Sequence, residues 1–169
     1  MPNDPYDELA TPLGHFLIAF NGLEVALAGA LMRILHQNDE LVGHAFVAIL
    51  GFRQKFELLK ALAPLVSHDG AREKLLELLE DANTINEARN RFVHSDYSPV
   101  FGDDGDTLVF LHQRLKDFLR TPRTLSATEL FKQYRPANPE ELLDLANDAS
   151  VLSDQLLRVS ERFFPEAKS

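Results

Sequence analysis

The stretch "INEARNRFVHS", residues 85–95, places a charge where its helical pattern requires an apolar side chain. At about 100° per residue, Arg89 projects into the middle of the apolar face formed by Ile85, Phe92 and Val93. A buried charge must pair with an opposite charge, reach a cleft or be neutralised, because an unpaired one is strongly destabilising. Arg89 is therefore the first candidate for a functional residue.

Two other helical stretches carry one charge each in the middle of an apolar face. Glu24 interrupts the first long stripe and Lys55 interrupts the second. Our structural hypothesis is that facing helices bring these charges together, with Glu24 accepting from Arg89, from Lys55 or from both. The alternative is that the long stems of Lys55 and Arg89 lie over apolar surface with their charged heads in water.

A stripe of neutral polar residues runs beside Arg89. Asn83, Asn86, Asn90 and His94 follow one another at three- or four-residue steps. Asparagine is a mediocre helix former, so three on one edge favour the polar lining of a cleft, with a solvated edge as the ordinary alternative. Arg89 and His94 are about 140° apart on an ideal helix. They converge only if the helix ends near His94, if Arg89 reaches across, or if a second protomer contributes.

The elements that must position these residues are mostly helical. Apolar residues at three- and four-residue steps predict long helices over about 11–35, 52–66, 69–94 and 138–164, with shorter ones over 39–50 and 126–135. Thr11 with Pro12, Asp69, and Asn138 with Pro139 are the expected helix starts, and Gly51 is expected to interrupt the second helical region.

Residues 97–111 depart from the helical pattern. Two short runs of β-branched and aromatic residues flank Gly102 and Gly105, which predicts a β-hairpin. The expected fold class is all-α: an antiparallel four- to five-helix bundle with this small hairpin inserted before the last helices. No linker or repeat divides the chain, so we expect a single domain over residues 1–169.

Composition narrows the classes of function. The chain has 169 residues, 45% of them apolar and 25% charged, as in a globular domain. It has no cysteine, which excludes disulfides, thiolate metal sites and cysteine nucleophiles. A net charge of −9 argues against a surface that holds duplex DNA by counterion release, so any nucleic-acid site must be local. The segment from Arg114 to Arg135 is locally basic, although a solvated charged face is the ordinary alternative.

Nothing in the sequence predicts export or a bound cofactor. The acidic start lacks a signal-peptide profile, and Asn21, Glu24 and Arg33 interrupt the most apolar window, so we expect a soluble, cytoplasmic protein without membrane contact. The remaining histidines are scattered, "DDGD" at 103–106 fits a turn better than a calcium loop, and no phosphate-binding glycine motif occurs. We therefore expect no metal and no cofactor.

The residues Arg89, Asn90 and His94 form R-N-x3-H, which resembles the R-x4-6-H motif of the HEPN superfamily of helical-bundle proteins. The motif closes the third long helix. The stretches "FLIAFNGLEVAL" and "LGFRQKFELLKAL" look like the corresponding first and second helices of standalone HEPN-like proteins. The resemblance covers about residues 13–97 well and the last helix loosely.

This resemblance implies a metal-independent endoribonuclease, a toxin or a stress or defence effector, that cleaves single-stranded RNA. Family members act as dimers in which the motifs of two protomers line one cleft. His94 would then be the general acid or base at the 2'-hydroxyl or the leaving oxygen. Arg89 would bind the scissile phosphate, and Asn90 would orient the phosphate or His94.

Further residues and partners follow from the same resemblance. Asn86, Glu24 and Lys55, singled out above by their positions on the helices, would support the site, and Asp96 would place a carboxylate near the phosphate or tune His94. Tyr97 stands three residues after His94, where some HEPN toxins carry a tyrosine two residues after the histidine. The implied partners are a second copy of the chain, RNA or a nucleotide, and a cognate antitoxin.

Two alternatives remain open at the level of the sequence. The chain could be a non-catalytic HEPN-like module that binds a nucleotide, RNA or a protein, with Arg89, Asn90 and His94 retained for helix packing. It could also be a purely structural or adaptor helical protein in which the motif is a coincidence.

Overall fold

The computed structural model describes residues 7–35, 40–101, 108–114 and 135–163. This part of the chain is mostly helical, which confirms the all-α class. Residues 126–134 of the predicted short helix lie outside the described residues. So do residues 102–107 of the predicted hairpin and most of the basic segment that begins at Arg114.

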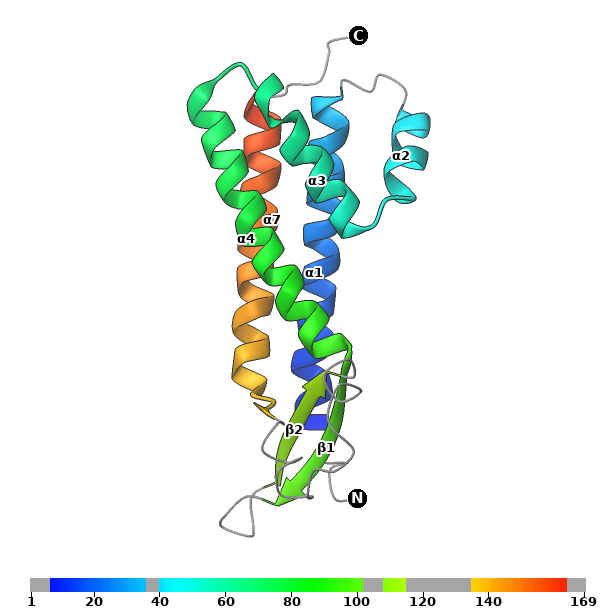
Figure 1. The fold of residues 1–169 in the computed structure, drawn as a ribbon, viewed down its shortest axis with the longest axis vertical. Coiled ribbons are helices and arrows are strands. Elements are labelled where there is room, and N and C mark those ends of the chain that lie inside the picture. The colour runs from blue at the N-terminus through cyan, green and yellow to red at the C-terminus, as the bar shows by residue number, and fades with distance from the viewer. Residues whose placement is uncertain (1–6, 36–39, 102–107, 115–134, 164–169) are drawn as a thin grey trace, which may run out of the picture.

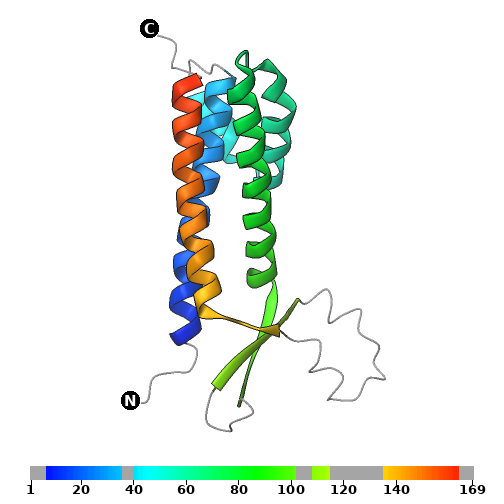
Figure 2. The same cartoon turned by 90° about the vertical axis from the view of Figure 1, so that its left-hand side faces the viewer.

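Figure 1 shows the helices lying side by side along the long axis of the molecule. They are α1 (Asp7–Ile34), α2 (Glu40–Ala48), α3 (Phe52–Leu62), the short 3-10 helix η1 (Ala63–Leu65), α4 (Asp69–Val93) and α7 (Pro139–Phe163). In Figures 1 and 2, α1, α3 and α7 run in one direction and α4 runs in the other.

Consecutive helices alternate in direction, and α1 and α7, the first and last of the described helices, pack side by side in parallel (Figure 1). Ser153 donates a hydrogen bond to the carbonyl of Gly22 at 3.0 Å, and further along both helices Arg33 and Glu161 pair at 3.8 Å. Helix α2 takes the chain back, so that α3 again runs parallel to α1 (Figure 1). Helix α4 alone among the long helices faces the others antiparallel.

Two helix starts lie where the sequence predicts them. Gly51 precedes α3, and its N–H donates to the side chain of Gln54 at 2.8 Å. The side chain of Asn138 accepts from the backbone N–H of Glu140 at 2.9 Å, at the start of α7. Each contact satisfies a backbone N–H group that has no partner within the helix or at its edge.

Two other starts differ from the prediction. Helix α1 begins at Asp7 rather than at Thr11, so Pro12 lies inside it. The helix tolerates this proline because it is still near the N-terminus, where one missing N–H interrupts a single hydrogen bond. Helix α4 is capped by His68 rather than by Asp69, with the His68 ring nitrogen accepting from a backbone N–H at 3.3 Å.

Aromatic rings connect α1 to its neighbours in the core. Phe16 meets Phe92 of α4 edge to face, with ring centroids 6.4 Å apart. One turn further along α1, Phe20 stacks on Phe52 of α3 with centroids 5.5 Å apart. Pairs of this geometry add to the stability that burial of the rings already provides.

Three strands extend from the end of α4. They are β1 (Ser95–Phe101), β2 (Leu108–Arg114) and β3 (Arg135–Pro136). Strand β1 pairs antiparallel with β2, from Ser95 opposite Arg114 to Phe101 opposite Leu108, and β2 pairs antiparallel with β3. The backbone therefore passes without interruption from the last turn of α4 into a sheet edge.

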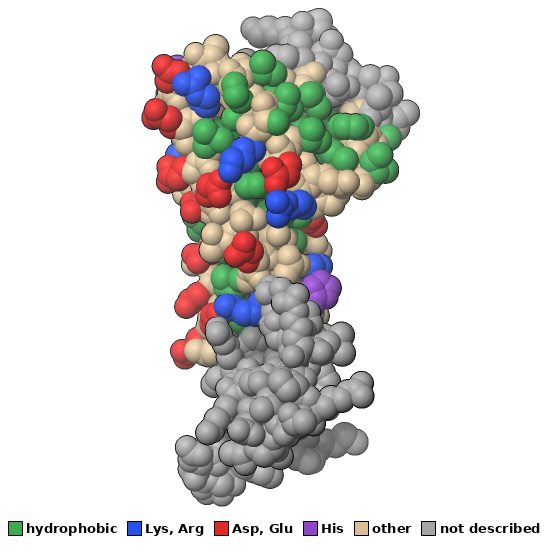
Figure 3. Space-filling view, viewed as in Figure 1, with side chains coloured by type: hydrophobic (Ala, Val, Ile, Leu, Met, Phe, Trp, Pro, Cys, Tyr) green, Lys and Arg blue, Asp and Glu red, His purple; other side chains and the backbone are tan. Residues whose placement is uncertain are grey.

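The face over α3 and α4 mixes acidic and basic side chains, with hydrophobic ones gathered towards α2 (Figure 3). Among the described residues, α1 is the one helix long and apolar enough to cross a membrane by length and composition. The core helix of a soluble protein passes the same test, and α1 contributes Phe16 and Phe20 to this core.

We expect Phe16→Ala to lower the free energy of unfolding by about 3–5 kcal/mol, because it removes a fully buried ring and its contact with Phe92. Leu65→Ala is the matched control. Leu65 is 70% exposed, so its truncation should change stability by no more than about 0.5 kcal/mol. Urea unfolding followed by circular dichroism measures both, and equal effects would contradict the core described above.

Candidate functional site

Arg89 lies half-buried on α4, against an aromatic ring. Its guanidinium carbon is 5.6 Å from the centroid of the Phe20 ring, and its Nη1 donates to the side-chain oxygen of Asn90 at 3.1 Å. Its Nε is buried without a hydrogen-bond partner. The ring contact and the bond to Asn90 hold Arg89 in place, while its buried Nε, like that of Arg91, lacks an acceptor among the described residues.

The predicted polar stripe is a chain of hydrogen bonds that leads to Arg89. Asn90 accepts from Arg89 and donates through Nδ2 to the side-chain oxygen of Asn86 at 3.5 Å. Both asparagines are half-buried. Asn83, at the far end of the stripe, instead donates to Glu87 at 3.4 Å. The stripe therefore fixes the orientation of the Asn90 amide, and through it that of the guanidinium.

His94 stands where α4 ends. It is the C-cap residue, with φ −104° and ψ 27°, and its backbone N–H donates to the carbonyl of Asn90 at 3.3 Å. Its side chain is exposed, and no described residue forms a hydrogen bond or an ion pair with the imidazole. The helix therefore ends at His94, which meets one of the three conditions under which His94 and Arg89 could converge. No hydrogen bond joins the two side chains.

The hypothesis that Glu24 pairs with Arg89 or Lys55 is wrong for this structure. No ion pair joins Glu24 to either cation, all three being described residues. The guanidinium of Arg89 lies over the Phe20 ring and is bonded to Asn90 instead. Lys55 is 9% exposed on the buried face of α3, and it is not among the fully buried nitrogens that lack a partner. This fits the alternative, a buried stem with its ammonium reaching water.

Arg91 is a site neighbour that the sequence reasoning missed. Its Nη2 donates to Glu141 at the start of α7, and its guanidinium carbon is 4.9 Å from the centroid of the Phe92 ring. The Ser95 hydroxyl donates to the Arg91 carbonyl. Glu141 lies 50 residues away in the sequence, so no local pattern could have revealed the pair. Arg91 ties the last turn of α4 to α7.

Tyr97 takes part, like Arg91, in the contacts that hold the last turn of α4, and it does not lie on the helix edge that carries His94. Its hydroxyl donates to the carbonyl of Phe92 at 2.6 Å. Burial raises the pKa of Tyr97 to about 12, although the nearby charge of Arg91 acts in the opposite direction. A phenol of this kind stays protonated at neutral pH. Asp96 lies in β1, and its side chain is outside the described part of the chain.

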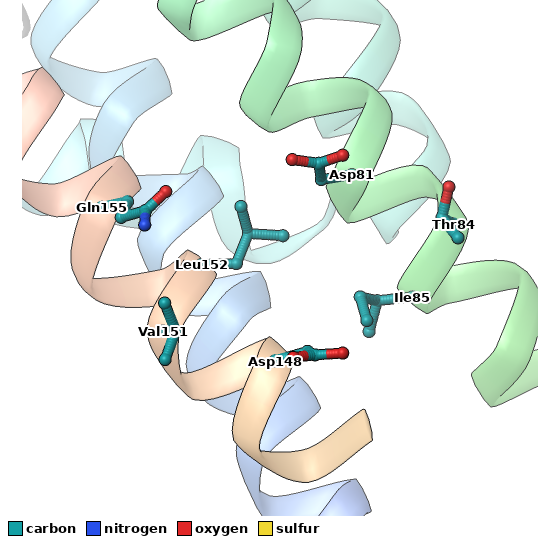
Figure 4. A pocket seen from close by; sticks show the side chains of 7 residues that line it. All are labelled: Asp81, Thr84, Ile85, Asp148, Val151, Leu152 and Gln155. Atoms are coloured by element: carbon teal, nitrogen blue, oxygen red, sulfur yellow. The ribbon is translucent and has the colours of Figure 1, made fainter. Parts of the chain in front are cut away.

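A separate groove of about 300 Å³ lies between α4 and α7 (Figure 4). Its lining residues come from both helices and are Asp81, Thr84, Ile85, Asp148, Val151, Leu152 and Gln155. It contains none of the predicted site residues. Within the described ranges, no three histidine or acidic side chains are grouped in a way that could hold a metal ion.

Comparison with known proteins gives no identification. No family model, no curated protein and no solved structure matches this chain. The resemblance to the HEPN superfamily therefore depends on the R-N-x3-H motif and the two helix sequences alone.

The raised pKa of Tyr97 predicts a loss of stability in alkali. The folded state binds the phenolic proton more tightly than the unfolded state, so this contribution is complete below pH 10 and is lost as the pH rises towards 12. Chemical unfolding at a series of pH values should show this fall in the wild type and a weaker one in Tyr97→Phe. Ultraviolet titration that finds all tyrosines ionising near pH 10 would contradict it.

Proposed function

We propose that this chain is a HEPN-like, metal-independent endoribonuclease that cleaves single-stranded RNA. The observation that carries the proposal is the end of α4. There a half-buried Arg89, bonded to Asn90 and with its Nε unsatisfied, precedes an exposed His94 at which the helix stops. A fixed phosphate-binding group and an accessible imidazole are the two parts that cleavage by the 2'-hydroxyl requires.

Each residue has a distinct part in the proposed reaction. Arg89 binds the scissile phosphate through the Nη end of its guanidinium, which the Phe20 ring and Asn90 hold in place. Asn90 orients Arg89 rather than His94. The 2'-oxygen bonds to phosphorus as the bond to the 5'-oxygen breaks. His94 accepts the 2'-hydroxyl proton or protonates the leaving oxygen, and the products are a cyclic phosphate end and a 5'-hydroxyl.

The fold, oligomeric state and cellular role that we propose follow from the resemblance to the HEPN superfamily. We propose that the helices form a HEPN-type bundle in one domain, with β1 and β2 as its hairpin insertion, and that two protomers place their motifs in one cleft. Each protomer supplies one Arg89 and one His94, so that a histidine can serve each side of the scissile bond. A soluble cytoplasmic toxin or stress effector with a cognate antitoxin fits this activity.

A non-catalytic HEPN-like module that binds a nucleotide, RNA or a protein is the second candidate. One observation favours it: Arg89 already has an aromatic ring and an amide as intrachain partners, which suits a role in packing α4 against α1. In that case the wild-type protein would bind RNA without cutting it.

We expect the purified protein to cleave single-stranded RNA in EDTA and to leave cyclic phosphate ends. Arg89→Ala should reduce the rate by about 10²–10³-fold, because it removes the donor to the developing phosphate charge. His94→Ala should reduce it by about 10²–10⁴-fold, because it removes general acid–base catalysis. Gel analysis of end-labelled RNA measures both rates.

Arg53→Ala and His15→Ala are the matched controls for these variants. Both side chains are exposed, and Arg53 is occupied by an ion pair with Glu57 on the same helix. Equal cleavage by the wild type and by Arg89→Ala and His94→Ala would reveal a contaminating nuclease. RNA binding without cleavage by the wild type would establish the second candidate instead.

Arg89→Ala should also lower stability, whichever candidate holds. It removes a partly desolvated cation–π contact and one hydrogen bond, together about 1–3 kcal/mol. Arg53→Ala should stay within about 0.5 kcal/mol of the wild type, because its ion pair is exposed. Thermal unfolding measures both variants, and an unchanged midpoint for Arg89→Ala would contradict the contacts that position this residue.

A further inference from the structure

The outer face of α1 carries an uncharged stripe with a seven-residue repeat. Thr11, Ile18, Val25 and Met32 are spaced by seven, and Gly14 and Asn21 each follow one of them by three; we call these six residues the α1 stripe. Ile18 is 74% exposed and Val25 is 69% exposed. A three-then-four alternation of this kind is the pattern of the contact positions in a coiled coil.

The α1 stripe lies on the side of α1 away from Arg89. Ile18 and Phe20 are two positions apart, which is about 200° around the helix, and the Phe20 ring is the one over which Arg89 lies. Figure 2 shows α1 and α7 along the edge of the molecule that is away from α4. A protein seated on the stripe would therefore not cover Arg89.

The α1 stripe is free of charge along its middle, in a chain with a net charge of −9. Between Glu8 and Arg33 the one charged residue of α1 is Glu24, about 100° around the helix from Val25. Only 39% of the most apolar window of α1 is buried inside the structure. An exposed helix face without charges is unusual unless another molecule covers it.

Gly14 provides a second, independent observation. Glycine inside a helix is destabilising relative to alanine, so a helical glycine calls for a packing reason. Gly22 and Gly29 have one, because a Cβ there would meet Ser153 at 3.8 Å and Leu157 at 3.9 Å on α7. A Cβ at Gly14 would meet nothing within 4 Å. A second chain that approaches the backbone closely at Gly14 would supply a reason that the described part of this chain does not.

We propose that the α1 stripe is the docking surface of a second copy of this chain, with the two α1 helices antiparallel about a two-fold axis near Asn21. From Thr11 to Met32 the stripe is about 32 Å long. With α7 alongside at about 8–10 Å, the face covers roughly 600 Å² on each copy, which is the lower limit for a stable interface.

The charges at the ends of α1 decide the antiparallel orientation. The first turns of α1 and α7 are acidic, with Asp7, Glu8 and Glu140, and their last turns carry Arg33, which also pairs with Glu161, and Arg162. Asp7 and Arg33 lie about 21 Å and 18 Å along the helix from Asn21, in opposite directions. Antiparallel pairing therefore brings the acidic end of each α1 to the basic end of the other, whereas parallel pairing would place like charges together.

This contact goes beyond the proposed function and does not depend on it. The proposed cleft around Arg89 and the α1 stripe are on different sides of α1, so a dimer through the stripe carries two separate sites. A chain that uses both the α1 stripe and the proposed cleft has two isologous interfaces, and it assembles into oligomers larger than a dimer.

The absence of cysteine makes the proposal directly testable, because a single introduced cysteine reports its own contact alone. A short bismaleimide should crosslink Asn21→Cys to itself, since the two-fold axis passes near it. Thr11→Cys alone should not crosslink, but an equimolar mixture of Thr11→Cys and Met32→Cys should. Leu65→Cys, 70% exposed on a different element, is the control for random collisions.

Sedimentation provides the second measurement. Ile18→Glu and Val25→Glu should each weaken association at least about tenfold, because each buries an unpaired carboxylate at the contact, while Leu65→Glu should not. Circular dichroism confirms that each variant folds. Crosslinking of Asn21→Cys no stronger than that of Leu65→Cys would overturn the proposal, and self-crosslinking of Thr11→Cys would overturn the antiparallel arrangement. Flotation of the wild type with phosphatidylcholine vesicles, without any Asn21→Cys crosslink, would assign the face to a membrane instead.

Discussion

The ring of Phe20 is the point at which three helices meet. On α1 it stacks against Phe52 of α3 and lies beneath the guanidinium of Arg89 on α4. The negative face of an aromatic ring attracts a cation without neutralising it, so Arg89 can occupy an apolar helix face without a carboxylate beside it. Its charge is thus not neutralised by a carboxylate, as a buried ion pair with Glu24 would have done.

The end of α4 depends on a second set of contacts, between side chains and the carbonyls of its last turn. Those carbonyls lack the N–H donor four residues on that a helix normally provides, and the hydroxyls of Ser95 and Tyr97 donate to two of them. Arg91 adds a link to Glu141 on α7. Together these bonds fix the residue at which the helix stops. The position of His94 relative to Arg89 is therefore set by β1 and α7 as much as by α4.

The sequence predicts those features that local periodicity controls. The all-α class, the break at Gly51 and the start of α7 at Asn138 are read from patterns a few residues long, and the structure confirms them. Contacts between residues that are far apart in the sequence cannot be read from such local patterns. Apolar periodicity identified Arg89 as inward-facing, but it could not distinguish a carboxylate from an aromatic ring as its partner. The parallel packing of α1 against α7 is likewise not readable from local patterns, because it joins residues as far apart in the sequence as Gly22 and Ser153.

A single helix face cannot serve both the core and a partner, and the proposed docking surface lies on the side of α1 opposite its core face. Phe16 and Phe20 point into the bundle, while Ile18 and Val25, two and five residues beyond them, stay exposed. A helix that was apolar for the sake of its core alone would carry charges on its outer side, as α4 does. The neutral outer side of α1 is therefore a separate constraint on the sequence. Because Phe20 and Ile18 point in opposite directions, the proposed assembly through α1 and the proposed chemistry at Arg89 can be tested by different substitutions in the same helix.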